Sequence, residues 1–80
     1  MSVTVLFLGP LRDIEGAAAR RLPAPLDWDG LIAAVNEEVA VQLRHQRVQV
    51  ACGGRVLADK TQLLAADGDE VALLPPVSGG

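Results

Sequence analysis

The sequence contains almost no aromatic residues and very little cysteine. Its 80 residues include two aromatic side chains, Phe7 and Trp28, and one cysteine, Cys52. A single cysteine excludes an internal disulfide and suits a reducing compartment. No apolar stretch approaches the roughly 20 residues of a membrane helix, and no basic segment followed by a long apolar run opens the chain. We therefore expect a cytoplasmic protein that has no membrane partner.

Positive charge is scarce and scattered. The formal net charge is −3, and the arginines occur in small groups, at 20–21 and at 44–47, without forming a basic stripe. Since nucleic-acid binding depends on neutralising phosphates, we expect no nucleic-acid partner. The sequence also lacks a Ser-His-Asp set, a paired acidic site and a phosphate-binding loop. We therefore expect a protein that is not an enzyme on its own, with no catalytic residues, no bound cofactor and no metal.

The composition and length of the chain predict one small folded domain. Half of them are hydrophobic, mostly Val, Leu and Ala, which at this length permits a single small core. The pattern predicts strands at 3–8, 17–22, 47–52, 55–57 and 70–74, a helical turn at 11–15, a loop at 59–66 and a main helix after Asp27. Glycine-containing turns are expected at 9–10, 53–54 and 67–69, each at the end or the start of a predicted strand. One helix crossing a small mixed sheet is an α+β architecture, with the strand order left open.

The main helix has clear start signals. Asp27 is a good N-cap, and Leu26 and Leu31 have the spacing of a hydrophobic staple. At about 100° per residue one arc collects the apolar side chains, and we expect this arc to face the sheet. Its members are Trp28, Leu31, Ile32, Val35, Val39 and Leu43. Asn36 and Ala40 fall outside the arc.

A few side chains offer chemistry, and each also has a structural interpretation. Cys52 has no second cysteine and no ligand at metal-site spacing, and its place in an alternating strand favours a buried small hydrophobe. His45 stands at the helix end, where a surface capping role is expected. Asp67 and Asp69 suggest a metal loop, but Asp-Gly-Asp before a strand is commonly a turn. We expect Trp28 at the top of the core.

The C-terminal segment carries the unusual chemistry. Residues 1–74 are expected to form the domain, and 75–80 an extended tail that reaches roughly 20 Å at about 3.3 Å per residue. The tail reads Pro75, Pro76, Val77, Ser78, Gly79 and Gly80. Glycine has no Cβ, so the Gly-Gly tip can enter a narrow tunnel. We expect a free carboxylate at Gly80, which is a poor electrophile until a partner enzyme activates it, for example as an acyl-adenylate.

Five segments spread over the whole chain resemble the small subunit of molybdopterin synthase. They are residues 3–8, 12–16, the helix headed by Asp27, 67–72 and 75–80. That family has the ubiquitin-like β-grasp fold, so the resemblance implies a small mixed sheet with one main crossing helix. The Asp-Gly-Asp-Glu-Val turn followed by Pro-Pro-Val-Ser-Gly-Gly is the most specific part. The sequence departs from the family at 73–74, where aromatic residues are common, and at 51–52, where Val-Asn is common.

The resemblance implies a sulfur carrier that works through its partners. A ubiquitin-activating-type enzyme would adenylate Gly80 with ATP, and a sulfur donor would convert the adenylate into a thiocarboxylate. The large subunit of molybdopterin synthase would accept the tail and supply the catalytic basic residues. There the sulfur would pass to a pterin precursor in molybdenum cofactor biosynthesis. Gly79 would keep the tip slender, and residues 75–78 would guide the tail.

Three other functions remain open on the sequence. The chain could carry sulfur for another pathway, such as thiamine, cysteine or transfer-RNA thiolation. It could be a ubiquitin-like protein modifier, in which Gly80 joins a lysine through an isopeptide bond. It could also be an interaction domain whose tail is incidental, because chain ends are often rich in small residues.

Overall fold

The computed structural model describes residues 1–76, which form a mixed sheet backed by helices. The main sheet has five strands in the order β2-β1-β7-β4-β5. Their bounds are β1 (Ser2–Phe7), β2 (Ala19–Pro23), β4 (Gln49–Cys52), β5 (Arg55–Val56) and β7 (Glu70–Leu74). The first and last strands, β1 and β7, lie parallel at the centre, and every other pair is antiparallel. The predicted α+β architecture is confirmed.

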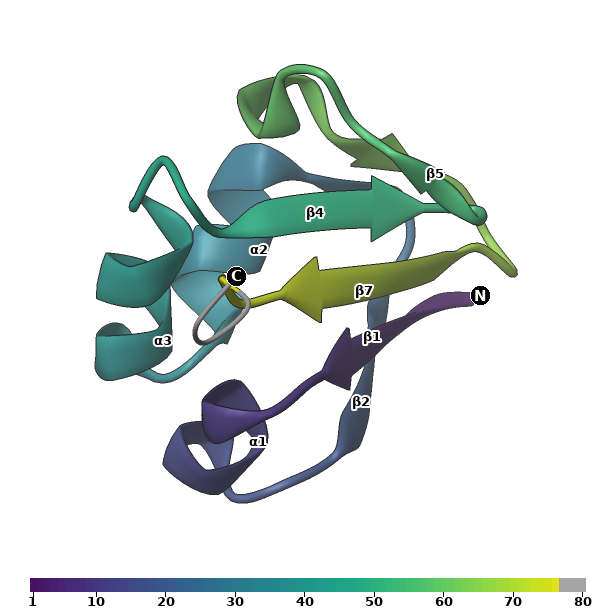
Figure 1. Cartoon of the computed structure of the whole chain (residues 1–80). Coiled ribbons are helices and arrows are strands. Elements are labelled where there is room, and N and C mark those ends of the chain that lie inside the picture. The colour runs from purple at the N-terminus through teal and green to yellow at the C-terminus, as the bar shows by residue number, and fades with distance from the viewer. Residues whose placement is uncertain (77–80) are drawn as a thin grey trace.

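Helices cover one face of this sheet and leave the other open (Figure 1). The helices are α1 (Pro10–Glu15), α2 (Trp28–Ala34) and α3 (Glu37–Leu43), and a 3-10 turn, η1, spans Lys60–Gln62. The alternation of β1 sends Val3, Val5 and Phe7 into the core beneath the helices. Each fully buried side chain of this kind stabilises the fold by about 1.5–3 kcal/mol. Among residues 1–76 no helix is long and apolar enough to cross a lipid bilayer.

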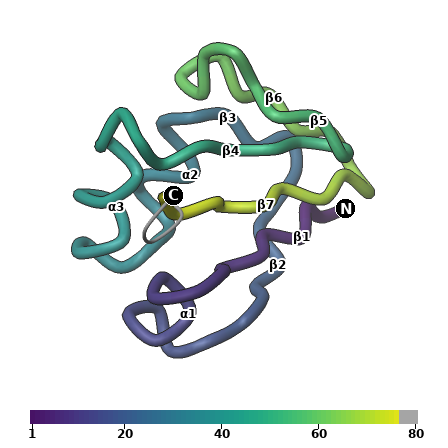
Figure 2. The backbone as a smooth tube through the Cα atoms, viewed as in Figure 1, coloured from purple at the N-terminus to yellow at the C-terminus, as the bar shows by residue number. Residues whose placement is uncertain are grey.

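The glycine turns form as predicted. Gly53 and Gly54 have φ of +60° and +84°, and they join β4 to β5 with Cys52 opposite Arg55. Positive φ at both central residues is the geometry of a type I′ hairpin turn, which two glycines adopt without strain. A second pairing was not predicted: β3 (Leu26–Asp27) lies antiparallel to β6 (Leu64–Ala65), away from the main sheet (Figure 2). Two-residue strands carry too little alternation to be recognised in a sequence.

The prediction of one continuous main helix is wrong, because the helix stops and restarts at 35–36. Its start is confirmed, since Asp27 Oδ1 accepts from Gly30 N–H at 2.8 Å. Val35 then adopts an extended conformation, and Asn36 caps a new helix by accepting from Glu38 N–H at 2.9 Å. The restart shifts the helical phase, so Ala40 is buried although the continuous arc placed it outside. The rest of the arc is confirmed, with Trp28 and Ile32 half-buried against the core.

An ion pair between Glu15 and Arg20, which lie far from residues 35–36 in the sequence, stabilises the helix break. Glu15, at the end of α1, accepts from Asn36 N–H at 2.8 Å and from the Arg20 guanidinium at 2.6 Å. Arg20, on β2, also donates to the carbonyl of Ala34 at 2.9 Å. These bonds satisfy the two backbone groups that the interrupted helix would leave unpaired. The Glu15 side chain is 6% exposed, so water replaces these bonds poorly.

We predict that Glu15→Ala lowers the free energy of unfolding by about 2–3 kcal/mol, because it leaves a partly buried Arg20 and the Asn36 N–H without their acceptor. Asp13→Ala is the matched control, since Asp13 is an exposed carboxylate on the same helix. Urea unfolding of the two variants measures the difference. Equal losses of unfolding free energy in the two variants would show that the Glu15–Arg20 ion pair does not stabilise the helix break.

Candidate functional site

The central strand of the sheet leads directly into the predicted tail. β7 lies between β1 and β4 and ends at Leu74, after which Pro75 is half-buried and Pro76 is exposed. The last four predicted site residues, Val77, Ser78, Gly79 and Gly80, lie outside the described residues. Because β7 is hydrogen-bonded on both sides, the start of the tail is attached to a central strand of the sheet. The division of the chain into 1–74 and 75–80 stays a prediction.

Pro75 sits against Gly9, at the end of β1. A Cβ built on Gly9 would lie 3.3 Å from Pro75 Cγ, which is tighter than ordinary van der Waals contact. Gly9 also has φ +57° and ψ −134°, a region that residues with a Cβ rarely enter. It is therefore the glycine, rather than any larger residue, that lets the first tail residue pack beside α1. The sequence indicated a strand end at this glycine but not its contact with the tail.

We expect Gly9→Ala to cost about 2–3 kcal/mol of stability, from backbone strain together with displacement of Pro75. The control is Gly16→Ala, because Gly16 also has positive φ, +81°, but nothing lies within 4 Å of the added Cβ. That change should cost only about 1 kcal/mol. Thermal or urea unfolding measures the stability of both variants. An equal loss of stability would show that the Pro75 contact does not contribute to it.

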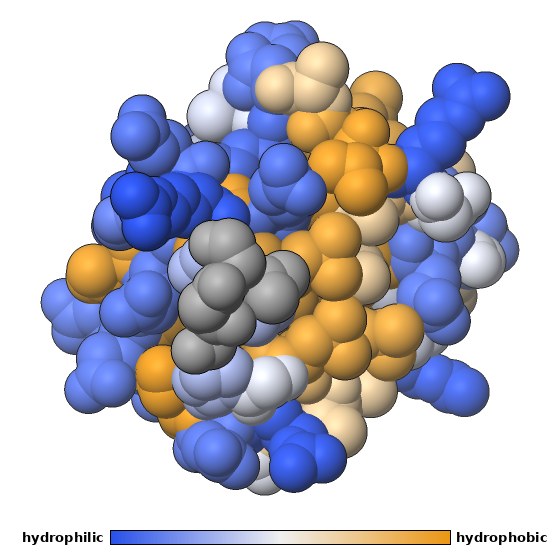
Figure 3. Space-filling model, viewed as in Figure 1, coloured by the Kyte–Doolittle hydropathy of each residue, from blue (hydrophilic) through white to orange (hydrophobic). Residues whose placement is uncertain are grey.

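The open face of the sheet carries an apolar row that crosses all five strands. The strand register places five small or aliphatic residues side by side, and we call them the open-face row: Ala19, Leu6, Ala72, Ala51 and Val56. Figure 3 shows apolar residues running across this face as a band. An exposed apolar band on a small folded domain is typical of a protein-binding surface. The alternation of residues 3–8 contained this signal, since Leu6 faces opposite to Val5 and Phe7.

Cys52 is half-buried and packs against the core, so the expectation of a buried small hydrophobe is met in part. It lies opposite Val71 on the core side of the sheet, with Sγ 3.9 Å from Asp69 Oδ2. Burial raises the pKa of the Cys52 thiol, and the nearby Asp69 carboxylate raises it further. Cys52 is therefore held as a neutral thiol and is a weak nucleophile.

The two aspartates of the 67–69 turn hold backbone groups. Asp67 Oδ1 accepts from Ser2 N–H, and Asp69 Oδ2 accepts from Ala66 N–H, both at 2.8 Å. Within residues 1–76 no three His, Cys, Asp or Glu side chains gather as a metal site would require. The turn therefore ties the start of β1 to the start of β7.

His45 is exposed just beyond the end of α3. Its Nδ1 accepts from Arg47 N–H at 3.2 Å, and its carbonyl oxygen accepts from the Lys60 ammonium. The residue therefore shapes the loop between α3 and β4. It lies far along the chain from the other chemistry-bearing side chains, and within residues 1–76 the structure brings none of them together with it into a catalytic group.

The sequence profile of the ThiS family matches residues 5–80. The chain belongs to the ThiS family. A search of curated protein sequences gave no match. Solved structures do resemble this ThiS-family chain. A chain of the complex of subunits 1 and 2 of molybdopterin-converting factor from Helicobacter pylori is 28% identical, with a TM-score of 0.66 and 100% of both chains covered.

Two further structures extend the comparison. SAMP1 from Haloferax volcanii is 26% identical with a TM-score of 0.71, again with 100% of both chains covered. The Amycolatopsis orientalis BexX/CysO complex contains a chain that is 20% identical with a TM-score of 0.75, covering 98% of this chain and 99% of that one. The predicted ubiquitin-like β-grasp fold is confirmed. This ThiS-family chain is a sulfur carrier or a ubiquitin-like modifier.

Proposed function

We propose that the chain is the sulfur-carrier subunit of molybdopterin synthase and that its reacting group is the Gly80 carboxylate. The observation that carries the proposal is the Pro-Pro-Val-Ser-Gly-Gly segment attached to the central strand β7. Similarity over the full length to a chain of the molybdopterin-converting factor complex supports the same pathway. The chain has few other groups to offer, since Cys52 is a neutral thiol and His45 stands alone.

The proposed chemistry is acyl activation followed by sulfur transfer. A carboxylate oxygen of Gly80 attacks the α-phosphate of ATP on the activating enzyme, and pyrophosphate leaves. Hydrosulfide supplied by the donor then attacks the carbonyl carbon, and AMP leaves. The resulting thiocarboxylate enters the large subunit, where its sulfur passes to the pterin precursor and water restores the Gly80 carboxylate. ATP is bound by the activating enzyme, and this chain needs no cofactor of its own.

The domain's part in this chemistry is to aim the tail and to bind. Pro75, packed on Gly9, gives the tail a fixed start, so that the distance from the domain to the reacting carbonyl is set by six residues. The open-face row offers the large subunit and the activating enzyme a water-excluding contact beside that start. Positioning of this kind is worth several orders of magnitude in rate, because the reacting group arrives already oriented.

A ubiquitin-like modifier is the second candidate, and the likeness to SAMP1 favours it. The activation step would be the same. The acceptor would differ, because a lysine amine of a target protein would attack the activated carbonyl and form an isopeptide bond. A sulfur carrier for the thiamine, cysteine or transfer-RNA pathways would likewise share the activation and differ in the acceptor.

Reconstitution with different acceptors distinguishes these candidates. The chain is first converted into its thiocarboxylate and then offered to the large subunit of molybdopterin synthase with the pterin precursor. A parallel reaction contains a thiazole synthase and its substrates. We expect sulfur to leave the chain only in the first reaction. Sulfur transfer only in the second would assign the chain to the thiamine pathway, and lysine-linked conjugates in cells in place of sulfur transfer would make it a modifier.

A further inference from the structure

The chain has a single lysine. Of its seven basic residues other than histidine, six are arginine and one is Lys60. The difference matters for a protein whose carboxyl group is to be activated, because an acyl-adenylate reacts with any accessible amine. A guanidinium stays protonated at neutral pH and is not a nucleophile, whereas a lysine amine is one when it loses its proton. Lys60 therefore carries the one side-chain amine that could capture the activated carboxyl group of another copy.

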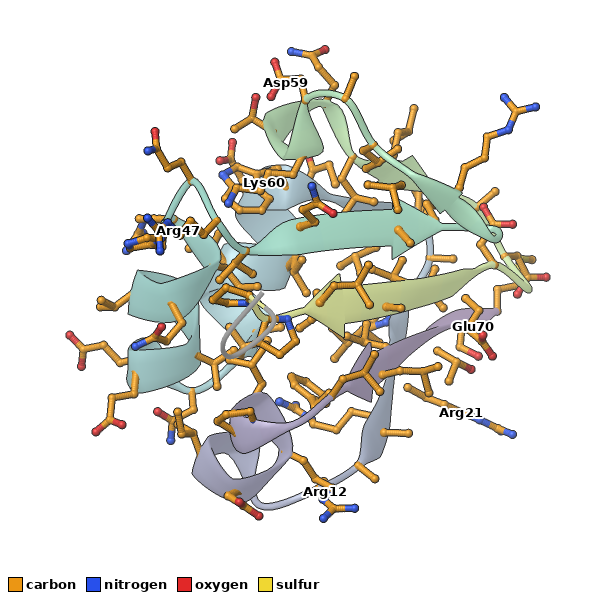
Figure 4. All side chains as sticks on the ribbon, viewed as in Figure 1. Arg12, Arg21, Arg47, Asp59, Lys60 and Glu70 are labelled. Atoms are coloured by element: carbon orange, nitrogen blue, oxygen red, sulfur yellow. The ribbon has the colours of Figure 1, made fainter. Side chains whose placement is uncertain are left out.

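The Lys60 ammonium is tied to the backbone. It donates to the carbonyl of Val48 at 2.7 Å and also to the carbonyl of His45. Both carbonyls belong to the loop that connects α3 to β4. Figure 4 shows Lys60 within the outline of the molecule beside the start of β4, whereas Arg12 and Arg21 point away from it. Lys60 thus bridges η1 to the opposite loop and is only half-exposed.

The turn that carries Lys60 is itself fixed. Asp59 Oδ1 accepts from the Thr61 N–H at 3.0 Å and from the Thr61 hydroxyl at 2.6 Å. These hydrogen bonds lower the pKa of the Asp59 carboxyl group. A shallow pocket of about 240 Å³ adjoins the turn, and Val48, Leu57 and Lys60 are among its lining residues. The side chain of Lys60 therefore extends from a hydrogen-bonded turn, and its ammonium group binds the backbone carbonyls of His45 and Val48.

We propose that Lys60 is closed to acylation, so that no side-chain amine of this protein accepts its own activated carboxyl group. The inference rests on the proposed activation at Gly80. In the excluded reaction the neutral amine attacks the Gly80 carbonyl carbon, a C–N bond forms, and the C–O bond to the adenylate breaks. AMP leaves, and the amine proton passes to solvent. Activated copies then remain available to the sulfur donor instead of linking into chains through lysine.

Acylation of Lys60 is opposed because it would cost the side chain hydrogen bonds to the backbone. An amide nitrogen formed on Lys60 keeps one N–H, so it can no longer satisfy the carbonyls of both His45 and Val48. It also loses the positive charge that strengthens both bonds. Partial burial lowers the pKa of Lys60, which enlarges the neutral fraction of the amine. It is therefore the anchoring of Lys60, and not its protonation, that protects it.

Competitive acetylation of the intact chain with an N-hydroxysuccinimide ester tests the anchoring without any activating enzyme. The matched comparison is the ε-amine introduced by Arg47→Lys, at an exposed position on the same loop. We expect Lys60 to react about tenfold more slowly, since one charge-assisted hydrogen bond must be broken. Equal rates in the peptide map would overturn the proposal. This outcome is independent of whether Gly80 is ever activated.

Self-linking of the chain prepared as a C-terminal thioester at Gly80 tests the consequence. Wild type and Lys60→Arg should give the same small amount of linked dimer, joined only through the Met1 α-amine. Arg47→Lys should give additional dimer joined through the introduced ε-amine. A Lys60-linked peptide in the wild type would contradict the proposal. If the thioester behaves as expected but the activating enzyme never forms an adenylate, the proposed function fails while the anchoring of Lys60 stands.

Discussion

Deletion of Gly80 is expected to abolish sulfur transfer and leave the domain folded. The deletion draws the terminal carboxylate back by roughly 3.3–3.6 Å, one residue of extended chain. A misplacement of about 1 Å can already cost a hundredfold in a positioned reaction, so turnover should fall by more than about a hundredfold. The described core contains no residue beyond Leu73, so the melting temperature should not change. Turnover with the large subunit and thermal unfolding measure the two effects.

Two further variants separate the tail from the alternative carrier group. Gly79→Val keeps the chain length but adds a β-branched side chain at the tip, and it should also block transfer. Cys52→Ala should transfer sulfur at the wild-type rate, because the thiol is neutral and packs against the core. Sulfur found on Cys52, or turnover that survives the loss of Gly80, would refute the assignment of the reacting group.

Leu6→Asp should weaken binding to the large subunit by about a hundredfold. Leu6 lies in the open-face row between Ala19 and Ala72, so a bound partner would bury the new carboxylate without a counter-charge. Thr4→Asp is the matched control, because Thr4 lies on the same strand and face but outside the row. Titration calorimetry gives the two dissociation constants, and circular dichroism checks the fold. An unchanged dissociation constant for Leu6→Asp would remove the open-face row from the interface.

The sequence was sufficient for most of the fold because the decisive signals were local. The strands at 3–8 and 70–74, the Asp27 cap and the Gly53-Gly54 turn each depend on neighbours along the chain, and each is confirmed. β2 is an edge strand of the sheet, and its charged residues Arg20 and Arg21 and its terminal Pro23 are typical of that position. Strand order required the pairing of β1 with β7, almost the whole chain apart, and periodicity contains no such information.

The helix break was missed because its cause is not local. Asn36 is a good N-cap residue, but the apolar residues Ile32, Val35 and Val39 keep helical spacing on either side of it and favour a continuous helix. What stabilises the break is the pair formed by Glu15 and Arg20, which comes from α1 and β2 and binds the freed backbone groups. The contact between Gly9 and Pro75 was missed for the same reason. Gly9 follows β1 and Pro75 follows β7, so the contact joins residues from opposite ends of the sequence.

The parts of the candidate site also differ in whether local sequence or long-range contacts define them. The chemistry of the tail stays a prediction, and the sequence alone supplies it because a Gly-Gly carboxylate can be recognised without knowing what surrounds it. The open-face row was not identified, because its five members come from five strands and only the register aligns them. The departures from the molybdopterin synthase pattern at 51–52 and 73–74 gave no guide to this surface, whereas the structure places Ala51 within it.

The sulfur-carrier assignment is tested most directly by the intact mass of the chain after incubation with ATP, a ubiquitin-activating-type enzyme and a sulfur source. We predict a gain of about 16 Da, the replacement of one carboxylate oxygen by sulfur. Fragmentation should place that gain on Gly80, and it should disappear when the large subunit and the pterin precursor are added. A chain that gains no mass, or that gains it at Cys52, would contradict the account.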